Sequence, residues 1–61
     1  MSNHDQLIAL FRTYEQENQK FEEKGVKASA ARARKALADI AKLCKERRAE
    51  IQEKKNEMEA K

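Results

Sequence analysis

The sequence predicts an all-α protein, an antiparallel hairpin of two helices in which the second is longer. Three observations support this prediction. The chain has no proline and one glycine, and it is rich in residues that favour helices. Apolar residues recur at steps of three and four along most of its length. The single glycine, Gly25, divides two such apolar patterns and suits the left-handed position that ends a helix.

The first helix is expected over residues 3–24, followed by a turn at Gly25. Asn3 and Gln6 have the spacing of a capping box, which predicts that the helix begins there. The residues expected on its apolar face are Leu7, Leu10, Phe11, Tyr14 and Phe21. Asn18 falls on the same face. There it either fixes the register in which the two helices pair or is hydrated at the edge of their contact.

The second helix is expected over residues 27–58, with residues 1–61 forming a single helical-hairpin domain. A chain folded back at Gly25 pairs positions whose numbers have a constant sum. The predicted pairs are Phe21 with Ala30, Tyr14 with Leu37, Phe11 with Ile40, and Leu7 with Cys44. Bulky residues meet alanine near the turn, so large and small side chains alternate across the seam.

A homodimer is expected because the chain has little apolar surface to bury. It has 61 residues, of which 41% are charged, and a single cysteine, so no disulfide can form within it. Cys44, at the seam, is expected to be a small buried residue. The expected dimer interface consists of the apolar residues that the hairpin leaves without partners: Ile8, Leu43, Ile51 and Met58. The dimer is expected as a four-helix bundle or an extended coiled coil.

The net charge of +3 is unevenly distributed. Residues 1–23 contain two basic residues against five acidic ones, and residues 49–61 contain three against four. Residues 24–48 contain nine against two, a local charge of +7, which predicts a polyanionic partner for this stretch. The expected nucleic-acid contacts are Lys24, Lys27, Arg32, Arg34, Lys35, Lys42, Lys45 and Arg48.

The basic residues of the second helix form one broad arc with alanines among them, which would let a phosphate backbone come close. About five phosphate contacts per protomer predict strongly salt-dependent binding. The alternative is a coiled-coil protein–protein interaction module with no nucleic-acid role. In that case the charges are a solvated surface in which Asp39 pairs with Lys35 or Lys42, and Glu46 with Lys42. A membrane surface fits less well, because the apolar face is used in the hairpin and lacks tryptophan.

The sequence offers nothing that predicts an enzyme. It has no Ser/His/Asp set, no paired carboxylates in a pocket and no glycine-rich phosphate loop. No cofactor, metal ion or small-molecule substrate is expected. No apolar run approaches the roughly 18 residues of a membrane span, and the N-terminus lacks the features of a signal peptide. A cytoplasmic location is therefore expected, with no membrane partner.

Residues 24–51 also carry a family resemblance. The elements that carry it are Lys24-Gly25, Lys27-Ala28, Arg32-Ala33-Arg34-Lys35, Leu37 and the series from Leu43 to Arg48. This stretch resembles the bacterial histone-like family typified by the chlamydial linker-histone-like protein. The resemblance implies a self-associating helical domain of a nucleoid-associated protein that binds double-stranded DNA with little sequence preference, with RNA left open. The chlamydial members continue into a long Lys/Ala/Pro-rich tail that this sequence lacks, so strong DNA condensation is not expected.

Overall fold

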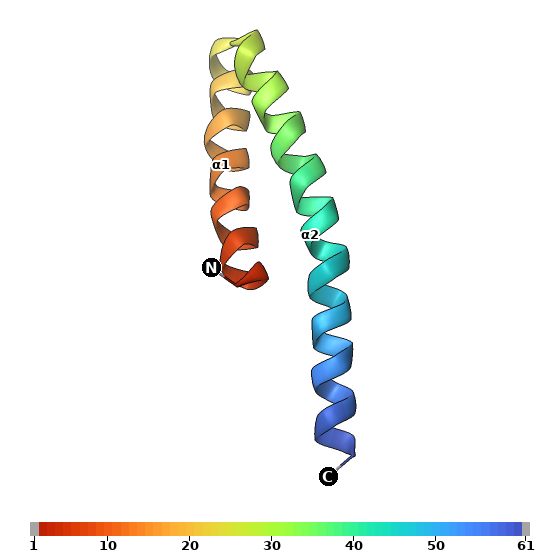
Figure 1. The fold of residues 1–61 in the computed structure, drawn as a ribbon. Helices are drawn as coiled ribbons and strands as arrows, with labels where there is room; N and C mark the ends of the chain where they lie inside the picture. Colours follow the sequence, from red (N-terminus) through yellow and green to blue (C-terminus); the bar gives the residue numbers. More distant parts are fainter. Residues whose placement is uncertain (1, 61) are drawn as a thin grey trace.

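The computed structural model describes residues 2–60 and consists of two α-helices joined by a short turn (Figure 1). Helix α1 is Asn3–Lys24 and helix α2 is Lys27–Glu59. The two helices run antiparallel and pack against each other, which confirms the predicted all-α hairpin. Helix α2 continues well beyond the N-terminal end of α1, so the molecule is elongated and measures 53 × 17 × 14 Å.

The predicted capping box at the start of α1 is wrong. The N-cap is Ser2, whose hydroxyl accepts a hydrogen bond of 3.1 Å from the backbone N–H of Asp5. Asn3 is already the first residue of the helix. A serine side chain reaches the free amides of the first turn, and the negative charge of Asp5 is favourable at the positive end of the helix dipole. The serine before the expected cap therefore starts the helix.

Gly25 ends α1 as predicted. Its backbone is left-handed, with φ of 66° and ψ of 29°, and its N–H donates a 2.9 Å hydrogen bond to the carbonyl of Phe21. Val26 then caps α2, where its carbonyl accepts hydrogen bonds from the N–H groups of Ser29 and Ala30. The chain thus reverses over two residues, which brings the start of α2 directly against the end of α1.

Small residues of α2 form the closest contact between the helices. Ser29, Ala33 and Ala36 are buried, and Ala36 is only 3% exposed. All three lie in the half of α2 nearest the turn, where their short side chains let the two backbones approach. This close approach positions the rest of α2, because the turn and the small residues together fix which face of the helix meets α1.

The predicted pairing of bulky residues is wrong in detail. Phe11 and Leu37 are exposed by 53% and 47%, and Cys44 is exposed. At 100° per residue, the face of α2 that meets α1 is rotated by about 50° from the predicted seam. Ala36 and Leu43 therefore face α1 in place of Leu37 and Cys44. The rotation has a physical reason, since packing on Ala36 brings the helices closer than packing on leucine.

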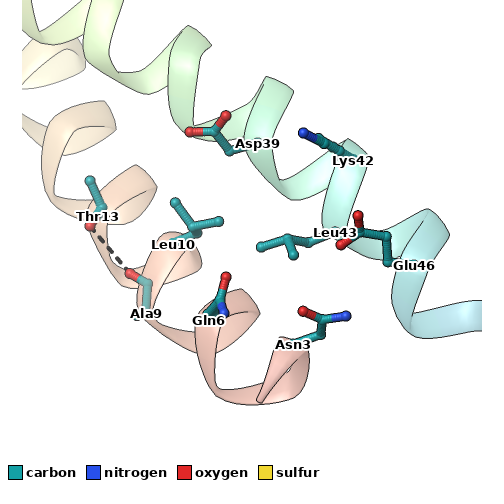
Figure 2. Close-up of a pocket in the computed structure, with 9 residues that line it drawn as sticks. All are labelled: Asn3, Gln6, Ala9, Leu10, Thr13, Asp39, Lys42, Leu43 and Glu46. Carbon is teal, nitrogen blue, oxygen red and sulfur yellow. Dashed lines mark hydrogen bonds between the residues drawn. The ribbon is translucent and has the colours of Figure 1, made fainter. Parts of the chain in front are cut away.

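The helices are closest near the turn and separate toward the N-terminus of α1 (Figure 1). A groove of about 530 Å³ lies between them there. Leu10 of α1 and Leu43 of α2 point toward each other across it, as Figure 2 shows. Leu43, expected at a dimer interface, is thus half-buried between the two helices of one chain.

Candidate nucleic-acid interface

The eight cations predicted to contact nucleic acid are all exposed. Lys24 ends α1, and the other seven are carried by α2. Arg32 turns toward α1, where its guanidinium Nη1 lies 3.5 Å from Oε2 of Glu17. Within residues 2–60, the seven others form no ion pair: Lys24, Lys27, Arg34, Lys35, Lys42, Lys45 and Arg48. Their charges are therefore available to an external anion.

Five of these cations form two rows along α2. The first row is Lys27, Arg34 and Lys45, and the second row is Lys35 and Lys42. At 100° per residue the rows lie about 80° apart around the helix axis. Ala31 and Ala38, both exposed, lie between the rows. We call these seven residues the outer face of α2, because they point away from the side on which Ser29, Ala33 and Ala36 meet α1.

The ion pairs expected of a simple solvated surface do not form. Neither Asp39 nor Glu46 lies within 4.0 Å of a basic side chain anywhere in residues 2–60. Both acids line the groove between the helices, where Figure 2 shows them on the side of α2 that borders α1. The acids and the first row of cations thus occupy different sides of α2, which leaves the positive charge of the first row uncompensated. Lys42 of the second row also lines the groove beside the two acids, although it forms no ion pair with them.

A buried polar contact beside the turn was missed by the sequence reasoning. The side chain of Glu17 is only 13% exposed. Its carboxylate forms ion pairs with Lys20 at 3.9 Å and with Arg32 at 3.5 Å. The fully buried hydroxyl of Ser29 lies beside it. The spacing of Leu10, Tyr14 and Glu17 was the available signal, because steps of four and three place all three on one helix face.

The Ser29 hydroxyl and the two cations lower the pKa of Glu17 below its ordinary value, against the opposing effect of burial. The serine has the largest effect, followed among the favourable contacts by Lys20 and Arg32. Neither Ser29 Oγ nor Glu17 Oε2 makes a hydrogen bond of standard geometry within the described residues, so their contact is a loose one. This cluster holds Arg32 against α1 and separates it from the outer face.

Beyond Glu46, α2 continues without a neighbouring helix. We call this part, residues 47–59, the α2 extension (Figure 1). Its cations are partly paired, Arg47 with Glu50 at 3.3 Å and Lys55 with Glu59 at 3.8 Å. Of the residues expected at the dimer interface, Ile51 and Met58 lie here and are 53% and 71% exposed. Ile8 is exposed on α1. The structure does not bring Ile8 and Leu43 together with these two.

Residues 2–60 bring no group of three or more metal-ligating side chains together. Over the same residues, neither helix has an apolar stretch with the length and hydropathy needed to cross a membrane.

A known protein family matches most of the chain. The model of the family described as Histone H1-like protein Hc1 matches residues 1–57. The match takes in α1, the whole outer face and most of the α2 extension, and it confirms the resemblance seen in residues 24–51. No curated protein and no solved structure matches this chain.

Proposed function

We propose that this chain, which belongs to the Histone H1-like protein Hc1 family, binds double-stranded DNA at the bacterial nucleoid through the outer face of α2. The observation that supports the proposal is the set of seven exposed cations without ion pairs in residues 24–48. Unpaired surface cations release the counterions of a nucleic-acid backbone when they contact phosphates, and this release drives binding.

The outer face favours phosphate contacts over base reading. Four of its five cations are lysines, which bind phosphate as point charges and do not form the bidentate hydrogen bonds that identify a base. Ala31 and Ala38 add no hydrogen-bonding group between the rows. The protein is therefore expected to bind duplexes of different sequence with similar affinity, as a structural protein of the chromosome requires.

Fluorescence anisotropy tests this proposal with labelled duplexes of two unrelated sequences, each of about two helical turns. Five phosphate contacts predict that the logarithm of the affinity falls with the logarithm of salt concentration with a slope of about −4 to −5. The double variant Lys35→Ala/Lys42→Ala is expected to reduce the magnitude of this slope by about two for both sequences.

The matched control is Lys54→Ala/Lys55→Ala, which removes the same charge from the α2 extension. We expect this variant to retain most of the wild-type affinity. Equal losses in the two double variants would mean that net charge alone, and not the outer face, attracts DNA. Absence of duplex binding at about 50 mM salt would contradict the proposal and favour the alternative, a coiled-coil protein–protein interaction module.

We also propose a homodimer, on the basis of exposed apolar residues. Leu37, Cys44, Ile51 and Met58 are all exposed and follow one another at intervals of seven. An apolar residue at every seventh position supplies one of the two seam positions in each heptad of a coiled coil. The α2 extension has 13 residues and no neighbouring helix in the chain, and most of the stability of helices in proteins comes from packing of an apolar face. A second copy would supply the missing contact.

The polarity of the dimer follows from charge. The α2 extension has four acidic and four basic residues and so no net charge, whereas residues 27–46 of α2 have six basic and two acidic residues, a local charge of +4 that repels its own copy. A parallel pair places like segments together, and an antiparallel pair places each extension against the basic segment of its partner. We therefore propose that the two α2 helices pair antiparallel, with Cys44 level with the partner's Ile51, and Leu37 level with the partner's Met58.

A further inference from the structure

We propose that the outer face of α2 lies in the major groove of B-form DNA, with its two rows of cations on the phosphates of opposite strands. The inference rests on the proposed function and deepens it, because it assigns the ligand as a DNA duplex and not an RNA duplex. Two observations carry it. The cations stand in two separated rows, and the side of α2 that bears them lies opposite the buried residues that pack on α1, with Lys42 at the edge of the groove between the helices.

The first observation concerns the arrangement of charge. A single row of cations would suit one strand, whereas two rows about 80° apart around the helix point to two strands. An α-helix with its side chains is about 10–12 Å across. The major groove of B-form DNA is about 12 Å wide and the minor groove about 6 Å, so only the major groove admits the helix between its phosphates.

The second observation concerns access. Ser29, Ala33 and Ala36 meet α1 on one side of α2, and Ala31 and Ala38 lie nearly opposite them. The side of α2 that would lie along the floor of the DNA major groove therefore presents only methyl groups between its two rows of cations. Helix α1 stays outside the DNA major groove, behind α2. The cation Arg32 points toward the hairpin, where Glu17 holds it, and is not needed in either row.

This geometry discriminates between duplexes. The major groove of A-form RNA is deep and narrow, and protein side chains do not read it. A helix that requires entry into the groove cannot place both rows on an RNA duplex. Contacts to phosphates from outside, by contrast, are possible on either polymer.

The test measures binding of the wild-type chain to a DNA duplex, to an RNA duplex of the same sequence, and to DNA whose cytosines carry bulky groups at position 5, which project into the major groove. The expected result is that the plain DNA duplex binds tighter than either competitor by on the order of tenfold.

A pair of substitutions locates the contact. Ala38→Glu places a negative charge between the rows and is expected to weaken DNA binding by at least the same factor. Ala49→Glu is the matched control, because it makes the same exposed substitution on the same side of the helix but in the α2 extension. Circular dichroism of both variants checks that the helices are retained.

Equal affinity for DNA and RNA, or indifference to the bulky groups, would overturn the major-groove inference and leave phosphate binding by α2 in place. Equal behaviour of Ala38→Glu and Ala49→Glu would also overturn it. Loss of binding to every duplex in the wild-type chain would instead overturn the proposed function itself.

Discussion

The backbone of Gly25 has a φ of 66°, which residues other than glycine rarely adopt. A methyl group built at this position meets nothing within 4 Å, so any effect of adding it comes from the backbone alone. The hairpin reverses direction at this residue, and the contacts of Ser29 and Ala33 with α1 depend on that reversal.

Gly25→Ala is expected to destabilise the hairpin by about 1 kcal/mol, because an L-residue is strained in the left-handed conformation. For a chain of this size, this corresponds to a fall in melting temperature of about 4–8 °C, measurable by circular dichroism. Gly25→Asn is the control, since asparagine tolerates this conformation better. A melting temperature unchanged in Gly25→Ala would mean that the turn does not limit stability.

Glu17 predicts a dependence of stability on pH. Its pKa is lowered in the folded protein from the ordinary value of 4.5, chiefly by Ser29, so folding favours the ionised carboxylate. Its contribution to stability is therefore present above pH 4.5 and is lost as the pH falls through the lower pKa of the folded state. Denaturation in urea across this pH range measures the effect.

The variant Glu17→Gln is expected to flatten this pH dependence, because it cannot ionise. Glu15→Gln is the control that removes one exposed carboxylate from the same helix. If Glu17→Gln and the wild-type protein lose stability in parallel between pH 5 and pH 3, other carboxylates, and not Glu17, dominate the acid response.

At the scale of elements, the sequence predicted most of the fold, because its main signals are local. The absence of proline, the apolar periodicity and Gly25 depend only on neighbouring residues, and they place both helices and the turn. The rotation of α2 against α1 was not predictable in the same way. It depends on whether Leu37 or Ala36 packs between the helices, a choice that long-range packing makes and that periodicity alone leaves open.

The candidate site was predictable to a similar extent. The charges of residues 24–48 identified the basic segment, and α2 carries seven of the eight predicted cations. The separate position of Arg32 was not predictable, because its partner Glu17 is distant in sequence and was not placed at the seam. Local ion-pair rules also suggested pairs for Asp39 and Glu46 that the groove side of α2 does not form.

Close packing of the helices predicts that Ala36→Leu destabilises the hairpin. The side chain is 3% exposed, and added methylenes in a packed contact typically cost about 1–3 kcal/mol. Ala38→Leu is the matched control on the outer face, where an exposed substitution changes stability by less than about 0.5 kcal/mol. Thermal denaturation compares the two. Similar melting temperatures would contradict the observed rotation of α2 and would favour the predicted packing, in which Leu37 lies between the helices.

The proposed dimer makes a prediction about cross-linking. In the antiparallel pairing, two Cys44 residues lie about 10 Å apart along the axis, since seven residues separate them. This exceeds the roughly 7 Å between Cα atoms that a disulfide spans. Under oxidation, wild-type protein is expected to stay unlinked, whereas Ile51→Cys, which sets a second thiol opposite Cys44, is expected to give a disulfide-linked dimer on a non-reducing gel.

Gln52→Cys, beside the seam, is the control and is expected to cross-link less. Linked dimer in the wild-type protein would contradict the antiparallel polarity and favour a parallel pair with Cys44 in register. A stable monomer in sedimentation, with no linkage in either variant, would remove the dimer.

The whole molecule is an elongated hairpin whose surfaces have different characters. The outer face of α2 is basic, and the groove between the helices is lined by two leucines, by Asp39 and Glu46, and by Lys42 at its edge. The α2 extension exposes apolar residues at intervals of seven. In the proposed dimer, each α2 extension is used for pairing and each outer face stays free, so one dimer presents two basic surfaces to DNA.

The most direct test of DNA binding by the outer face is an NMR titration of the isotope-labelled protein with duplex DNA, followed by amide chemical shifts. The predicted result is that shifts concentrate at Lys27, Arg34, Lys35, Lys42 and Lys45 and at the alanines between them, and that higher salt reverses the changes. Shifts confined to α1 or to residues 47–59, or no shifts at about 50 mM salt, would contradict DNA binding through the outer face of α2.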